Sequence, residues 1–258
     1  MVSTMWDKLK RILRGGIIAA FWIGLWWLIA WRVDQILLIP TPLDALKTLW
    51  QLLPTQEFWK TVGLSLWRVC HGFVGAVVVG TIAAIITAHV GWLRALLSPL
   101  LHIIRAAPVA SFIILTMVWL DYDNIPSLIA FLMVLPIIWV NVEEGIRRTD
   151  RDLLEMARVY RLSAPRILTR LYLPSVKPFF TTACVNGLGF AWKSGVAAEV
   201  ICGPDFAIGD RLQVARMYLE TPEVFAWTAV VVTLSIVLEK LLLRVTKTAR
   251  KEGAYDHA

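Results

Sequence analysis

Polar residues with helical spacing occupy a segment between two long apolar stretches, where they could form a docking surface. From Asp150 to Tyr160 the charges of Asp152, Glu155 and Arg158 recur at three-residue steps, as on the polar face of an amphipathic helix. The spacing therefore predicts a helix outside the apolar stretches. An ordinary solvated basic loop is the alternative interpretation.

A second short helix is predicted directly after the first one. Ser163 is a suitable N-cap and Pro165 suits a first helical turn. The turn between the helices then falls at Arg161 to Ala164, and it would present Tyr160, Leu162 and Ile167 to a binding partner.

A second polar group lies inside the apolar stretch from Pro178 to Cys202. Lys193 and Glu199 are six residues apart, about 240° around an ideal helix, so separate partners are expected for them. Charged side chains in a membrane span face a cavity or a partner because their burial in hydrocarbon is costly. We expect this stretch to form a wall of a substrate pathway, with Lys193 and Glu199 as structural residues in the alternative interpretation. The candidate pathway residues are Thr182, Asn186, Trp192, Lys193 and Glu199.

Other patterns that carry chemistry are missing from the sequence. His102 beside Arg105 is interpreted as a hydrogen-bonded interfacial residue rather than a ligand, and no metal site is indicated. The sequence has no Gly-rich phosphate loop and no Ser/His/Asp set at a plausible depth. We therefore expect no cofactor in this chain and no ATP hydrolysis by it, so the energy source must be another chain.

Composition places the chain among membrane proteins. Hydrophobic residues make up 58% and charged residues 17% of the 258 positions, which is more apolar surface than one soluble core of this size can bury. The formal net charge is +7, but no soluble domain is left to carry a nucleic-acid-binding patch.

Six apolar stretches approach the roughly 20 residues that a membrane-spanning helix requires. We place them near residues 16–33, 66–90, 103–120, 125–142, 178–202 and 224–243. A short amphipathic helix is also expected from about Leu43 to Leu53, at the outer interface. The prediction is an all-α polytopic protein with a single domain over residues 1–258.

Six crossings place both termini on one side, and the basic residues identify that side. Of the 26 Lys and Arg residues, 19 fall before the first span, at the second loop, between Arg147 and Lys177, or from Lys240 onward. The positive-inside rule makes this side cytoplasmic.

The segment from Glu155 to Pro174 resembles the E-A-A-x3-G-x9-I-x-L-P signature of the membrane subunits of bacterial ABC importers. Ala157, Leu171 and Leu173 fall in register with the two end residues, whereas Met156 and Arg161 depart from the signature. Arg161 stands at the usual glycine position, so either the turn differs or strain of roughly 1 to 2 kcal/mol is tolerated there.

In that family the loop docks into the ATPase subunit, and here it would cover about residues 143–177. The helical pattern and the resemblance together give ten candidate coupling residues: Glu155, Ala157, Tyr160, Arg161, Leu162, Ser163, Ile167, Leu171, Leu173 and Pro174.

Further fragments resemble the nitrate, sulfonate and taurine branch of these type I permeases, namely Leu66 to Phe73, Arg105 to Asp121 and Ala191 to Glu199. The resemblance implies a homodimer in the bacterial inner membrane, two cytoplasmic ATPase subunits that bind ATP and Mg, and an external solute-binding protein. The implied substrate is a small anion such as a sulfonate, nitrate or bicarbonate, with a vitamin precursor such as hydroxymethylpyrimidine as the alternative.

Two functions of other classes compete with transport. An integral-membrane enzyme would need Lys193, Glu199, His102 and Asp121 to converge at one depth. A membrane sensor or assembly subunit would use the polar loop for docking without transport.

Overall fold

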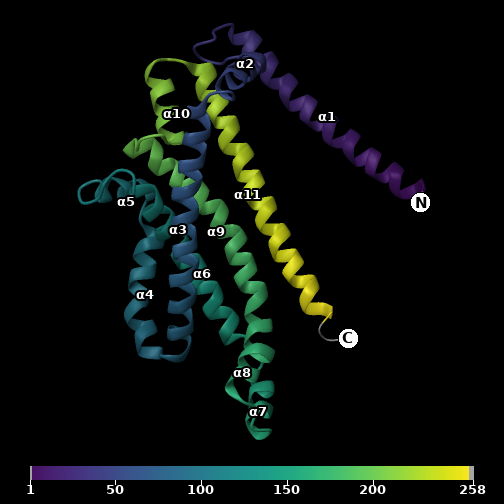
Figure 1. Ribbon diagram of the computed structural model, residues 1–258, viewed down its shortest axis with the longest axis vertical. Coiled ribbons are helices and arrows are strands. Elements are labelled where there is room, and N and C mark those ends of the chain that lie inside the picture. Colours follow the sequence, from purple (N-terminus) through teal and green to yellow (C-terminus); the bar gives the residue numbers. More distant parts are fainter. Residues whose placement is uncertain (1, 256–258) are drawn as a thin grey trace. The chain divides into compact units, whose positions relative to one another are not determined.

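The computed structural model describes residues 2–255, and the side chains of residues 16–244. All regular structure in this range is helical (Figure 1), which confirms the predicted all-α fold. The side chains of the predicted cytoplasmic cations Lys8, Lys10, Arg11 and Arg14, and of those beyond Arg244, lie outside the described residues. In chain order the elements are α1 (Val2–Val33), α2 (Pro42–Leu52), α3 (Gln56–His89), α4 (Gly91–Ala106), α5 (Val109–Thr116), α6 (Ile125–Arg147), α7 (Arg151–Val159), α8 (Ala164–Ile167), the π-helix η1 (Leu168–Tyr172), α9 (Leu173–Cys202), α10 (Ile208–Met217) and α11 (Thr221–Tyr255).

Four helical stretches within the described residues are long and apolar enough to cross a membrane. They are Gly16–Val33, Gln56–His89, Ile125–Arg147 and Thr221–Arg244, and they cover the predicted first, second, fourth and sixth spans. Helix α9 covers the predicted fifth span with 30 residues, about 45 Å, but it does not reach the same apolarity. The predicted number of six spans is therefore not confirmed.

The predicted third span, residues 103–120, is not one straight helix. Helix α4 ends at Ala106, and α5 leaves at an angle of 101° after a short break. Ala107 is extended, with ψ 139°, because the ring of Pro108 disfavours helical geometry at the residue before it. Together α4 and α5 are long and apolar enough to cross a membrane as one bent span, so the predicted third span is not confirmed as a single helix.

Contacts group the chain into two compact units, residues 60–210 with 232–258 and residues 1–59 with 211–231. The core of the larger unit lies between α6 and α9, which pack along their length. Buried residues of α6 include Ile129, Val134 and Ile138.

Small residues allow α3 to approach α6 closely within the larger unit. A Cβ atom on Gly72 would lie 2.1 Å from the backbone oxygen of Ser127, and one on Gly80 would lie 3.1 Å from the Cβ of Ile138. Small residues of this kind let neighbouring membrane helices approach closely.

In the smaller unit, the predicted short helix is confirmed as α2. Thr41 and Asp44 form a capping box at its start, which fixes the chain direction after the first span. Trp50 on this helix is 75% exposed. Ring stacking contributes to the packing of this unit, since Phe58 stacks on Trp227 with centroids 5.1 Å apart.

Candidate coupling segment and translocation helix

We call residues 150–174 the coupling segment. Its predicted amphipathic helix is confirmed as α7. Asp150 caps its start, because the carboxylate accepts a hydrogen bond of 2.9 Å from the amide of Asp152. Ala157 is fully buried, whereas Glu155 is exposed. The helix therefore turns its small residue inward and its acidic residue outward.

A left-handed residue ends α7 at the position where the signature has glycine. Arg161 has φ 51°, the Leu162 amide donates to the Ala157 carbonyl at 2.9 Å, and the Arg161 amide donates to the Arg158 carbonyl at 3.0 Å. This pair of bonds is the Schellman motif, which usually has glycine at the left-handed position. Of the two alternatives for Arg161, the structure shows that the glycine-type turn is kept and the strain is tolerated.

The second predicted helix is present but is not a separate element. Ser163 stands at the N-cap of α8, although its side chain makes no capping hydrogen bond; its carbonyl instead accepts from the amides of Arg166 and Ile167. Helix α8 continues through η1 into α9 without leaving helical geometry at Leu168 or Leu173. Residues 164–202 thus form one continuous helical rod, whereas the sequence predicts a loop up to residue 177 and a span from residue 178.

The tip between α7 and α8 exposes apolar side chains. Tyr160 is 73% exposed and Val159 is 79% exposed, whereas Leu162 and Ile167 are half-buried. Val159 was missed because the helical pattern assigns it to the inner face of α7. Of the remaining candidate coupling residues, Leu171 is half-buried, and Leu173 and Pro174 are exposed.

Helix α9 carries an exposed stripe of side chains at three- and four-residue steps. The stripe includes three of the candidate pathway residues, Thr182, Asn186 and Lys193, together with Phe190 and Ala197. Lys193 has no hydrogen bond or ion pair with any residue that the structure describes. It is therefore a cation on an otherwise uncharged stretch of this stripe.

The other two candidate pathway residues lie inside the packed unit. Trp192 is 1% exposed and Glu199 is fully buried. The separation of about 240° between Lys193 and Glu199 thus holds in the structure, and the two side chains do not meet. The five candidates divide into an exposed polar set and a buried set.

Glu199 belongs to a buried polar network that the sequence reading missed. Its Oε2 accepts from the Ser65 hydroxyl at 2.9 Å and from the Gly209 amide at 3.1 Å. Arg68 approaches the other carboxylate oxygen at 3.9 Å, forms an ion pair with Asp123, and donates to the Asp205 carbonyl at 2.8 Å.

This network ties the loop after α9 to α3 and to the loop before α6, which carries Asp123. The sequence does hold one signal for this network, because Arg68 and Asp123 lie at the ends of apolar stretches, where each needs a partner. No group of three or more potential metal ligands comes together in the part of the chain that the structure describes.

Comparison with known proteins shows which family the chain resembles. Residues 76–248 match the model of the family described as binding-protein-dependent transport system inner membrane component. The chain is 30% identical over 224 residues to a probable ABC transporter permease protein of Brucella melitensis, which covers 85% of this chain and 89% of that protein.

Two further comparisons extend the first. The chain is 30% identical over 216 residues to the putative aliphatic sulfonates transport permease protein SsuC of Escherichia coli, which covers 83% of this chain and 78% of that protein. The fold is similar to a chain in a crystal structure of a bacterial ABC transporter involved in the import of the acidic polysaccharide alginate. That match has a TM-score of 0.59 at 14% identity and covers 95% of this chain and 99% of the other.

Proposed function

Because this chain belongs to the family of binding-protein-dependent transport system inner membrane components and is the permease subunit of an ABC importer, we propose that residues 150–174 dock a separate ATPase subunit. The observation that carries the proposal is the continuity of α8, η1 and α9. A force applied at the exposed tip of the segment would reach the polar stripe of α9 through one helical rod.

The proposed cycle is alternating access. ATP closes a dimer of ATPase subunits, the segment moves with it, and α9 opens the pathway outward; hydrolysis then resets the permease. The π-helix η1 lies between the docking tip and the stripe, and such irregular turns are frequent at functional sites. Within α9, Glu199 and Trp192 would position the wall from its buried side, while Thr182, Asn186 and Lys193 would face the solute.

The proposed assembly has two copies of this chain, two ATPase subunits that bind ATP and Mg, and an external solute-binding protein. The family description supports an inner-membrane component that works with a binding protein. Two copies would let the exposed stripes of α9 line a common pathway, which explains why a polar stripe in a membrane protein is left uncovered by the chain's own described helices.

The proposed orientation has the segment from Arg147 to Lys177 in the cytoplasm with both termini. The eight basic residues of this segment support it. An ATPase supplied with cytoplasmic ATP could dock only on that side.

The proposed substrate is a small anion of the sulfonate class. Lys193 supports this because an unpaired cation in a span is costly unless an anion meets it. The similarity to the sulfonate permease of Escherichia coli agrees with this chemistry.

The rival functions gain no support from the geometry. An enzyme site would need Lys193, Glu199, His102 and Asp121 together, but Lys193 and Glu199 lie on different sides of α9, and His102 is bonded to Ser98 on α4. A sensor would leave the stripe of α9 without a role.

The test is ATP-driven uptake into proteoliposomes that contain the chain, its co-expressed ATPase and its binding protein. Labelled methanesulfonate should accumulate only with internal ATP, and Lys193 should be needed. Uptake of labelled hydroxymethylpyrimidine instead would exclude the anion assignment but keep the transport function. No ATP-dependent uptake of any solute held by the binding protein would contradict the proposal itself.

A further inference from the structure

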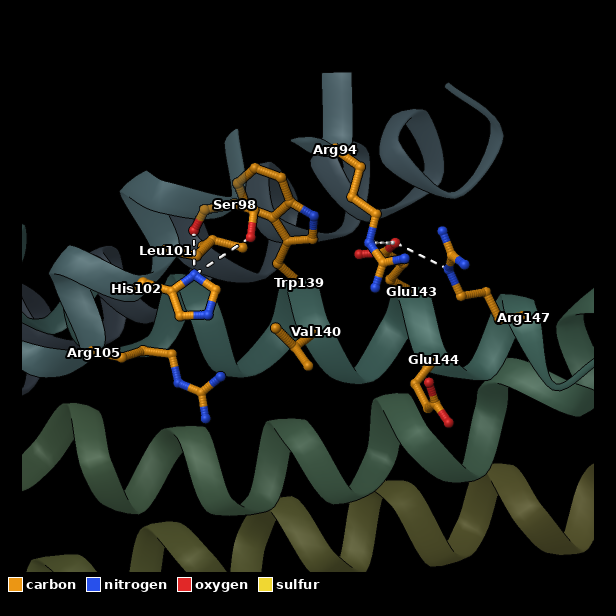
Figure 2. Close-up of a pocket in the computed structure, with 10 residues that line it drawn as sticks. All are labelled: Arg94, Ser98, Leu101, His102, Arg105, Trp139, Val140, Glu143, Glu144 and Arg147. Carbon is orange, nitrogen blue, oxygen red and sulfur yellow. Dashed lines mark hydrogen bonds and ion pairs between the residues drawn. The ribbon is translucent and has the colours of Figure 1, made fainter. Parts of the chain in front are cut away.

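A pocket of about 150 Å³ lies between α4 and α6, apart from the stripe of α9 and from the coupling tip. Figure 2 shows its polar and aromatic lining: Arg94, Ser98, His102 and Arg105 come from α4, and Trp139, Glu143, Glu144 and Arg147 come from α6. Arg94 forms an ion pair with Glu143 near the end of α6, whereas Arg105 lies near the end of α4 (Figure 2).

Positive charge exceeds negative charge in this pocket. Arg94 and Arg147 both reach the same oxygen of Glu143, at 2.9 Å and 3.1 Å, so two guanidinium groups share one carboxylate. The neighbouring acid, Glu144, is paired with Arg148 at 2.6 Å. Three arginines but only two acids line the pocket.

Arg105 is the third of these arginines. Its guanidinium group has no hydrogen bond or ion pair within the described part of the chain, and it lies beside His102 in the pocket (Figure 2). The five N–H donors of an arginine form a planar fork that matches the oxygens of a carboxylate, sulfonate or phosphate group.

The His102 ring is oriented to add a contact. Its Nδ1 lies 2.7 Å from the Ser98 carbonyl oxygen, and because a carbonyl can only accept, Nδ1 carries the proton. The other ring nitrogen, Nε2, carries a lone pair in the neutral ring, so it donates to an oxyanion only when the imidazole is protonated. In Figure 2, His102 and Arg105 lie at one side of the pocket, and Arg94 and Arg147 lie at the other.

We propose that this pocket between α4 and α6 binds a small oxyanion, with Arg105 as its principal ligand. The oxyanion is a sulfonate, phosphate or carboxylate group, and it has two possible sources, a soluble anion or the headgroup of an anionic lipid. Basic pockets between membrane helices are known to hold lipid headgroups. The inference does not depend on the proposed transport cycle, because it concerns binding without nucleotide.

The test is equilibrium binding of ³⁵S-labelled sulfate to the full chain in phosphatidylcholine nanodiscs. A second arm adds phosphatidylglycerol and counts the molecules retained by native mass spectrometry. Arg105→Gln should weaken binding of the retained anion at least tenfold, whereas Arg105→Lys, which keeps the charge but loses the planar fork, should weaken it less. Arg32→Gln, which removes an exposed arginine of α1 outside the pocket, is the matched control and should bind as wild type.

The two arms identify the source of the oxyanion. Saturable sulfate binding in phosphatidylcholine alone indicates a soluble anion. Retention of phosphatidylglycerol that displaces sulfate indicates a headgroup. The proposal is overturned if the wild-type chain binds neither, if Arg105→Gln binds like wild type, or if Arg32→Gln loses as much as Arg105→Gln. If Arg105→Gln fails to fold, Arg105→Lys must still bind sulfate or phosphatidylglycerol, and its failure to do so overturns the proposal.

Discussion

At the scale of single residues, the chain tolerates local strain where the coupling turn requires it. Arg161 adopts φ 51°, a region that costs a non-glycine residue roughly 1 to 2 kcal/mol. The Schellman bonds from Arg161 and Leu162 offset part of this cost because they satisfy two carbonyls of α7.

The strain at this turn can be measured by exchanging Arg161 for glycine. Arg161→Gly should stabilise the turn by about 1 kcal/mol, since glycine enters the left-handed region freely. Hydrogen exchange of the amides of residues 157–162 should then slow by about fivefold. Arg158→Gly, in the regular part of α7, should have the opposite effect, because glycine inside a helix costs about 1 kcal/mol. Equal effects of the two substitutions would exclude strain at Arg161.

At the scale of elements, periodicity predicted α7 and α2 well because their apolar and polar faces alternate with the helical period. It did not indicate the bend of 101° between α4 and α5, which lies at Pro108. It also divided α8 from α9, because Pro174 and Pro178 suggest breaks. In the structure Pro174 directly follows η1 and Pro178 lies inside α9, without interrupting the helix.

The sequence predicted which residues of α9 belong to the candidate pathway, but it did not predict all of their contacts in the fold. Thr182, Asn186 and Lys193 share a face because their spacing follows the helix. The partners of Glu199 could not be predicted, because Ser65 and Gly209 reach it only through tertiary packing.

The exposed position of Lys193 on α9 predicts that its substitution lowers transport but leaves the stability of the complex unchanged. Lys193→Met should lower uptake of labelled methanesulfonate at least tenfold, because it removes the cation that would meet the anion. The thermal midpoint of the purified complex should stay within about 2 °C, since an exposed residue without a partner contributes little to stability. Lys193→Arg is the control that keeps the charge. Normal uptake by the Met variant, or loss of assembly, would make Lys193 a structural residue.

At the scale of the whole molecule, the distribution of basic residues predicts the orientation in the membrane. The segment from Arg147 to Lys177 should be cytoplasmic. Thr149 is a poor reporter because it is 5% exposed, whereas Arg166 is exposed. In a variant without Cys70, Cys184 and Cys202, Arg166→Cys should resist a membrane-impermeant maleimide in intact cells and react in inverted vesicles. Labelling in intact cells would reverse the orientation.

The central claim is that residues 150–174 dock the ATPase, and co-purification of the co-expressed ATPase with tagged permease tests it most directly. Glu155→Arg reverses an exposed charge of α7 and should reduce the ATPase recovered at least fivefold, while the permease itself stays folded. Glu239→Arg, the same change on an exposed face of α11, should recover the wild-type amount. Wild-type recovery with Glu155→Arg, together with ATP-driven uptake at the wild-type rate, would contradict the account.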